Sequence, residues 1–141
     1  MSHDGHPNPE NPENPENPES IARAYLAAVG DKDHARVRAL LAADVTFDGP
    51  VMSLRGSDEV IEAFRRIGAI HVRNDVRRVF VDGDEVCVIY DFVTDPPGSL
   101  PTIEWLRIRG GRIASVKLYY DQLPWQALRQ ELAERAARAS A

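Results

Sequence analysis

The chain has 141 residues, of which 43% are hydrophobic, and this is enough for one globular domain with one apolar core. Its single cysteine, Cys87, excludes a disulfide framework and a cysteine-based zinc site. No apolar run approaches the roughly 20 residues of a membrane span, and the N-terminus has no signal-peptide pattern, so we expect a cytoplasmic protein with no membrane partner.

The net charge of −5 lies in the first 19 residues, which carry five acidic side chains and no lysine or arginine. The rest of the chain carries 17 acidic and 17 basic side chains and is formally neutral. A nucleic-acid surface needs a clear basic excess, so we expect no nucleic-acid partner.

The N-terminal segment differs in composition from the rest, because residues 8–19 are four copies of Asn-Pro-Glu. Proline at every third position fixes φ and removes hydrogen-bond donors, and the repeat offers no apolar group to bury. We therefore predict a disordered, polyproline-like tail over residues 1–19 and a folded domain over residues 20–141. A solubilising role for the tail and docking of a partner protein are both open.

Apolar residues at helical spacing occupy most of the first half of the domain. Three helices are predicted to follow Ser20, Asp33 and Ser57, the expected N-caps. A short strand over residues 45–48 separates the second helix from the third, and the stretch before Ser57 is predicted to be a loop.

Strand patterns fill most of the second half. Strands are predicted over residues 71–81 and 85–94, and a hairpin over Thr102 to Asp121 turns at Gly110-Gly111. Pro124 is expected to end the last strand, and an amphipathic helix over residues 125–139 closes the chain. Helices segregated from a continuous antiparallel sheet indicate an α+β fold.

Glu104 is the unusual residue of the hairpin. It shares one face of its strand with Thr102, Leu106 and Ile108 and is the only charged residue on that face. Burying an ionised carboxylate without a partner is costly, so such a group pairs, becomes protonated or faces a wet cavity. A surface ion pair with an arginine at the sheet edge is the structural alternative.

Asp91 repeats this pattern in the strand over residues 85–94, where it shares a face with Cys87 and Ile89. The opposite face is also apolar, so we expect the strand to be covered on both sides, by helices or a cavity on one side and by another subunit on the other. The alternative is that Asp91 starts the bend into the following loop.

The order of these elements and several segments resemble the SnoaL-like branch of the nuclear transport factor 2-like superfamily, which includes ketosteroid isomerase and limonene epoxide hydrolase. The matching segments are ARAYLAAVGDKDHARVRALLAADVTFDGP, LRGSDEVIEAF and EWLRIRGGRIASVKLYYD. The resemblance implies a curved antiparallel sheet forming a cone-shaped barrel, with N-terminal helices closing an apolar pocket. It also implies a homodimer through the outer sheet face.

The resemblance further implies a candidate acid/base site. Tyr25 falls where ketosteroid isomerases keep an oxyanion-hole tyrosine, and Glu104 falls where they keep a protonated aspartic acid. Their general base falls on Gly49, with Asp48 one position away. Tyr25, Asp48 and Glu104, with Asp91 as an alternative acid, would then move a proton next to a carbonyl group.

The implied ligand is a small apolar carbonyl compound of steroid or polyketide type, and no cofactor or metal is expected, because no phosphate-binding loop or metal-ligand spacing occurs. The residues expected to line the pocket are Phe47, Met52, Phe64, Ile89, Leu106, Val116, Leu118 and Tyr120.

Related chemistries lack essential groups in this chain. The aspartate that polyketide cyclases and epoxide hydrolases use falls on Leu118, and an arginine of the epoxide hydrolases falls on Ile89. The residues of the implied isomerase site also have purely structural interpretations, since Asp48 could be a turn residue and Tyr25 a core residue. A non-catalytic ligand-binding or dimerisation module is therefore the alternative function.

Overall fold

The computed structural model describes residues 17–95 and 98–140. The helices are α1 (Pro18–Gly30), α2 (His34–Leu40), α3 (Ser57–Ile67) and α4 (Gln122–Ser140). The strands are β1 (Leu41–Asp48), β2 (Ser53–Arg55), β3 (His71–Asp82), β4 (Glu85–Thr94), β5 (Ser99–Arg109) and β6 (Arg112–Tyr120). The predicted α+β class and the order of elements are confirmed. The predicted loop before α3 contains β2, which sequence reasoning missed.

The starts of two helices differ from the prediction. Asn17, not Ser20, caps α1, because its side chain accepts a hydrogen bond of 2.8 Å from the Ser20 N–H and Pro18 occupies the first turn. Residues 17–19 therefore belong to the domain, and the remainder of the predicted tail lies outside the described residues. Gly56, with φ of 89°, precedes α3, and Ser57 is the first helical residue. Asp33 caps α2 as predicted.

Six strands form one sheet in the order β2-β1-β6-β5-β4-β3. All neighbouring pairs are antiparallel except β1 and β6, which run parallel. The sheet is thus mixed, whereas the sequence pattern predicted a purely antiparallel one. It is also open, with β2 and β3 as its edges, so the cone does not close into a barrel.

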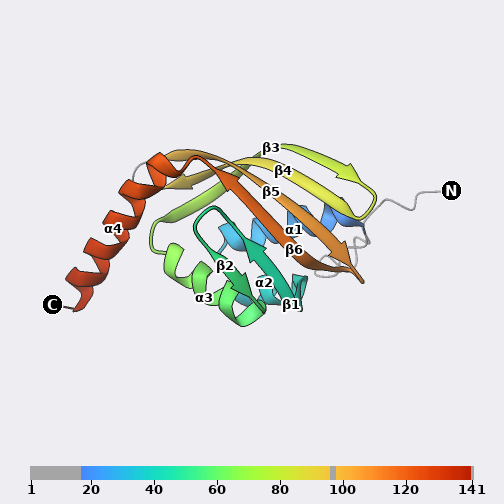
Figure 1. Ribbon diagram of the computed structural model, residues 1–141, viewed down its shortest axis with the longest axis horizontal. Helices are drawn as coiled ribbons and strands as arrows, with labels where there is room; N and C mark the ends of the chain where they lie inside the picture. Colours follow the sequence, from blue (N-terminus) through green and yellow to red (C-terminus); the bar gives the residue numbers. More distant parts are fainter. Residues whose placement is uncertain (1–16, 96–97, 141) are drawn as a thin grey trace.

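Figure 1 shows the sheet curving over α1, α2 and α3, which lie on its concave side, with α4 at one end of the sheet. Shifts in strand register accompany this curvature, two of them in the β3–β4 pair and one in the β5–β6 pair. The apolar core lies between the helices and the concave face, and it includes Ile21, Leu26, Val60 and Leu106.

The β5–β6 hairpin has the predicted geometry. Gly110 and Gly111 take φ values of 58° and 78°, which L-residues with side chains rarely adopt, and they reverse the chain between the two strands. Burial alternates strictly along β5, so Thr102, Glu104 and Leu106 face the interior while the residues between them face outward.

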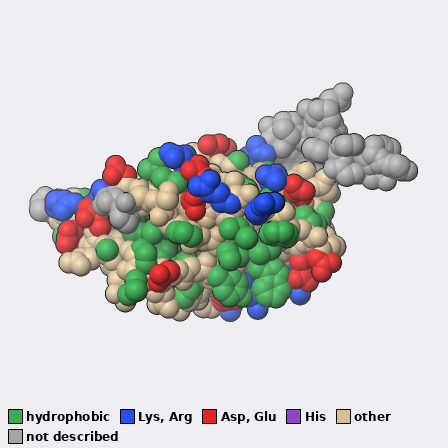
Figure 2. All heavy atoms as spheres, turned by 90° about the horizontal axis from the view of Figure 1, so that it is seen from above, with side chains coloured by type: hydrophobic (Ala, Val, Ile, Leu, Met, Phe, Trp, Pro, Cys, Tyr) green, Lys and Arg blue, Asp and Glu red, His purple; other side chains and the backbone are tan. Residues whose placement is uncertain are grey.

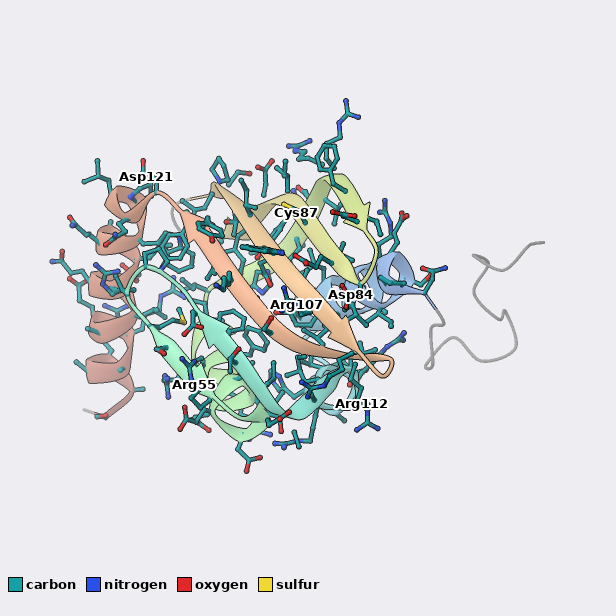
Figure 3. The ribbon with its side chains drawn as sticks, turned by 45° about the vertical axis from the view of Figure 1, so that its right-hand side comes forward. Arg55, Asp84, Cys87, Arg107, Arg112 and Asp121 are labelled. Carbon is teal, nitrogen blue, oxygen red and sulfur yellow. The ribbon has the colours of Figure 1, made fainter. Side chains whose placement is uncertain are left out.

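The join between β6 and α4 corrects the predicted end of the last strand. Asp121 follows β6 directly and lies where α4 begins (Figure 3). Its carboxylate accepts a hydrogen bond of 3.0 Å from the Leu123 N–H. Pro124 lies inside the first turn of α4, where a missing N–H costs nothing, and does not terminate the strand. None of the helices in the described ranges is long and apolar enough to span a membrane.

Candidate functional site

A cavity of about 250 Å³ lies between the concave face of the sheet and helices α3 and α4. Its lining is mostly apolar and aromatic. The lining residues are Val29, Phe47, Val51, Met52, Leu54, Ala63, Phe64, Arg66, Ile67, Tyr90, Phe92, Thr102, Glu104, Leu118, Tyr120, Trp125, Arg129 and Leu132. Among the described residues, Glu104 is the only carboxylic acid that lines it.

Glu104 is held deep in the fold by the register of the hairpin. It lies on β5 opposite Val88 of β4 and Leu118 of β6, and only 4% of its surface is exposed. The Tyr25 hydroxyl donates a hydrogen bond of 3.0 Å to Oε1, and the Tyr90 hydroxyl donates one to Oε2. Each carboxyl oxygen therefore has one phenolic donor, and the residues directly opposite on the two neighbouring strands, Val88 and Leu118, are apolar.

This environment changes the acidity of all three groups. Burial raises the pKa of Glu104 from 4.5 to about 7, and the hydrogen bonds from Tyr90 and Tyr25 lower it only in part. Burial, followed by the nearby charge of Glu104, raises the pKa of both tyrosines well above the ordinary value, so they remain donors. Glu104 therefore exchanges its proton near neutral pH, in the range where a general acid or base is most effective.

The two tyrosines that contact Glu104 differ in their position relative to the cavity. Tyr25 is fully buried on α1 and contacts Glu104 from behind the cavity wall, whereas Tyr90 of β4 lines the cavity beside it. Sequence reasoning missed Tyr90. Alternation along β4 places Tyr90 on the face opposite Asp91. The contact of its hydroxyl with the Glu104 carboxyl group also depends on the β4–β5 register, in which Val88 pairs with Glu104.

Five of the predicted lining residues do line the cavity, namely Phe47, Met52, Phe64, Leu118 and Tyr120. Three others do not. Leu106 and Val116 are fully buried in the core beneath the cavity, and Ile89 lies on the outer face of β4. Ile89 shares that outer face with Asp91, as the alternation along the strand predicted. The expectation that Ile89 lines the cavity is wrong, because this face points away from it.

Asp48 does not reach the cavity, in contrast to the proposed acid/base set. Its carboxylate accepts hydrogen bonds of 2.8 Å from Ser53 Oγ and 2.9 Å from Arg55 Nη1, at the exposed β1–β2 edge. These hydrogen bonds, that of Arg55 first, hold its pKa below the usual range. Asp48 is therefore an ionised surface residue of the β1–β2 hairpin.

Gly49, not Asp48, is the residue that faces the cavity at this point of the chain. A Cβ atom built on Gly49 would lie 3.5 Å from side-chain atoms of both Leu118 and Met52, which line the cavity. A side chain at this position would therefore point toward residues of the cavity wall, and Gly49 has none.

Asp91 is also outside the cavity. It lies on the outer face of the sheet, where its carboxylate accepts a hydrogen bond of 2.8 Å from Arg77 Nε and a second contact from Nη2 of the same guanidinium. Asp91 and Glu104 therefore lie on opposite faces of the sheet, and of the three candidate acids Asp48, Asp91 and Glu104 only Glu104 lines the cavity.

Aromatic side chains join α4 to the sheet and complete the cavity wall. Trp125 of α4 packs on Phe92 and Tyr120, with ring centroids 5.4 and 5.0 Å away, and His71 stacks on Phe92 with ring centroids 4.1 Å apart. Arg135 adds hydrogen bonds to two backbone carbonyls at the end of the sheet. One face of α4 therefore belongs to the site.

Within the described ranges, no group of three or more His, Cys, Asp or Glu residues is placed to hold a metal ion. Leu118 of β6 lies directly opposite Glu104 and supplies an apolar part of the cavity wall there.

The family model of the SnoaL-like domain matches residues 22–116, which is more than half of the chain. The chain belongs to the SnoaL-like family. A search of curated proteins gives no significant match to it.

Solved structures share the fold of this SnoaL-like chain at low sequence identity. A nuclear transport factor 2-like protein of unknown function from Cytophaga hutchinsonii has a TM-score of 0.70 at 20% identity, covering 77% of this chain and 93% of that one. A protein with a ketosteroid isomerase-like fold from Catenulispora acidiphila, in complex with trimethylamine, has a TM-score of 0.66 at 24% identity, with coverage of 75% and 88%.

A de novo designed protein with a curved β-sheet is equally similar, with a TM-score of 0.71 at 19% identity and coverage of 83% of this chain and 94% of that one. The fold thus also occurs in a designed protein. These similarities establish the fold, and the function has to be argued from the site.

The buried Glu104 makes the stability of the protein depend on pH in a defined direction. Its pKa in the folded state is about 7, above the ordinary 4.5, so the folded state binds more protons between these values. The contribution of Glu104 to stability is therefore fully present below pH 4.5 and is lost as the pH rises through 7, by roughly 3 kcal/mol in total. We predict that Glu104→Gln, which cannot ionise, becomes more stable relative to wild type as the pH rises from 5 to about 8.

Urea denaturation at a series of pH values measures this difference. Other titrating groups, including His71, whose pKa burial lowers, are present in both proteins and cancel. Glu134→Gln, which removes an exposed carboxylate, is the matched control and should show no such trend. A difference between Glu104→Gln and wild type that does not change with pH would contradict a raised pKa at Glu104.

Proposed function

We propose that this SnoaL-like chain binds a small apolar carbonyl compound in the cavity and that neutral Glu104 donates a hydrogen bond to its oxygen. The observation that carries the proposal is a carboxylic acid with a pKa of about 7 inside an apolar cavity. Below this pH the group holds a proton, which a ligand oxygen would accept in a setting where water does not compete.

The size of the cavity favours a compact ligand. Its volume of about 250 Å³ lies below the range of roughly 300–1,000 Å³ that is typical of drug-sized ligands. The lining contains several aromatic rings, including Phe47, Phe64 and Phe92, which suit flat apolar molecules. A body of one or two rings therefore fits better than a four-ring steroid.

Proton transfer by Glu104 is a second candidate function, favoured by the match between its pKa and neutral pH. Ionised Glu104 would take a proton from the carbon next to the carbonyl, and the C–H electron pair would form the C=C bond of an enolate. Protonated Glu104 is a weaker acceptor, which frees the Tyr90 hydroxyl to donate to the enolate oxygen. Return of the proton to another carbon of the conjugated system completes an isomerisation.

In this second candidate Glu104 is the only carboxyl group that takes part, because Asp48 points to the surface and Gly49 has no side chain. Binding without chemistry requires fewer groups and is therefore the first proposal.

The outer face of the sheet supports a further proposal, a homodimer. Figure 2 shows hydrophobic side chains gathered on this face, and the residues include Phe80, Ile103, Trp105 and Tyr119, which are 37–56% exposed. They come from β3, β5 and β6 and form one apolar patch of a kind that marks interaction sites. A second copy of the chain would cover it.

Binding and proton transfer are expected to respond to pH in opposite directions. α-Tetralone, a bicyclic ketone, should bind more weakly as the pH rises through about 7, because Glu104 loses its proton, whereas tetralin, without a carbonyl, should bind independently of pH. Deuterium uptake next to the carbonyl of α-tetralone in D2O should instead increase through the same pH, because that step needs ionised Glu104. NMR spectroscopy measures both quantities.

Two variants are the controls for these experiments. Glu104→Gln should remove the pH dependence of ketone binding and abolish enzyme-dependent exchange, and Gly49→Asp places a second carboxyl group at the cavity wall and should increase exchange. Equal affinity for α-tetralone and tetralin at every pH would contradict the binding proposal. Ketone binding without any exchange in the wild type would eliminate the second candidate alone.

Loss of the apolar patch should dissociate the proposed dimer. We predict that Ile103→Lys sediments as a monomer at concentrations where the wild type is a dimer, because a desolvated charge opposes burial. Leu123→Lys alters an equally apolar but more exposed residue outside the sheet, at 71% exposure, and should leave the dimer intact. A monomeric wild-type protein in analytical ultracentrifugation would refute the homodimer.

A further inference from the structure

Two arginines line the cavity at the point where it opens to solvent. Arg66 projects from α3 and Arg129 from α4, and both are exposed although both belong to the lining. Glu104 lies at the closed, buried end. The described cavity therefore has an acid at its inner end, apolar and aromatic walls, and positive charge at its mouth.

Neither guanidinium is engaged by a strong partner among the described residues. Arg66 lies 3.8 Å from Glu62, beyond hydrogen-bond distance, and both side chains are at least 60% exposed. No carboxylate within the described ranges lies within ion-pair distance of Arg129. Exposed pairs such as Arg66–Glu62 contribute little, so both charges are available to a ligand.

The charge of Arg129 also acts on a residue of the cavity wall. Its positive charge opposes the effect of burial on the pKa of Tyr120, whose ring lines the cavity and packs on Trp125. Arg129 and Trp125 are four residues apart on α4 and so lie on the same face of that helix. A ligand that packs against Trp125 would extend toward the Arg129 guanidinium.

We infer that the ligand of this cavity is an amphipathic anion, with a compact apolar body against the aromatic wall and a carboxylate-like group at the mouth beside Arg66 and Arg129. This inference rests on the proposed function and adds the charge class of the ligand. The positive mouth attracts anions and repels cations during entry, and an anion placed there keeps its charge partly in water.

The arrangement also separates the two polar ends of the ligand. An anionic group next to Glu104 would suffer repulsion from the ionised carboxylate, whereas an anion at the mouth leaves Glu104 free to donate to a carbonyl or hydroxyl oxygen. The cavity volume of about 250 Å³ suits a compact apolar body between the two polar ends.

A cationic ligand is the competing class. Aromatic rings and an ionised Glu104 would suit an ammonium group at the inner end of the cavity. The two arginines at the mouth would repel a cation during entry. No described acidic residue other than Glu104 lines the cavity to offset this repulsion. The experiment therefore includes a cationic probe.

Three probes with the same naphthalene body separate these cases: 2-naphthylacetate, its neutral methyl ester, and 2-(2-naphthyl)ethylamine. Titration of the full chain at pH 6.5 and low salt, followed by NMR, should show that the anion binds roughly threefold to tenfold more tightly than the ester. The preference should shrink at high salt, because the arginines are exposed. The amine should bind most weakly.

The double variant Arg66→Gln/Arg129→Gln should bind the anion and the ester equally, with the affinity for the ester unchanged. Arg65→Gln, which removes a neighbouring exposed arginine of α3 that does not line the cavity, is the control and should keep the preference. Both substitutions are at exposed helical positions, and equal melting temperatures would show that the variants fold.

Equal affinity of the wild type for the anion and the ester would overturn the inference while leaving the proposed ligand cavity intact. Tightest binding of the amine would also overturn it and would assign Glu104 the role of counter-ion. Absence of binding by all three probes would instead contradict the proposed function itself.

Discussion

The hydrogen bonds from Tyr25 and Tyr90 to the two oxygens of Glu104 are the interaction on which the site depends. Without donors, a carboxyl group at this depth would carry a proton at any physiological pH or would destabilise the fold. With them, its pKa remains at about 7, so both protonation states are populated near neutrality. The same three residues join α1, β4 and β5, and the site is therefore part of the core that holds the helices against the sheet.

The pairing of the strands and the turn after β1 determine which other side chains surround Glu104. Cross-strand pairing places Leu118 opposite Glu104 and keeps the surroundings of the acid apolar. The turn after β1 directs the side chain of Asp48 to the surface and the bare Gly49 to the cavity. Because Asp48 precedes Gly49 by one residue and points outward, Glu104 is the only carboxyl group among the described residues that line the cavity.

Much of the fold could be predicted from the sequence, because alternation in Thr102–Asp121 and the glycine pair define a hairpin whatever surrounds them. The buried position of Glu104 follows from the same alternation. The contacts between distant elements could not be predicted, since Tyr90 reaches Glu104 only through the β4–β5 register. The assignment of Asp91 as an alternative acid of the site failed for a related reason. Both faces of β4 are apolar, so composition does not tell which face points inward.

Both proposed roles of Glu104 require that it changes its protonation state near neutral pH inside an apolar cavity. Carbon-detected NMR of 13C-labelled glutamate side chains, with the Glu104 signal assigned by its absence in Glu104→Gln, measures this titration directly. We predict a midpoint of about 7 for Glu104, well above the ordinary glutamate value. A midpoint at or below 4.5 would show that water or an unseen cation solvates the carboxylate, and it would contradict both the donor role and the proton-transfer role of this residue.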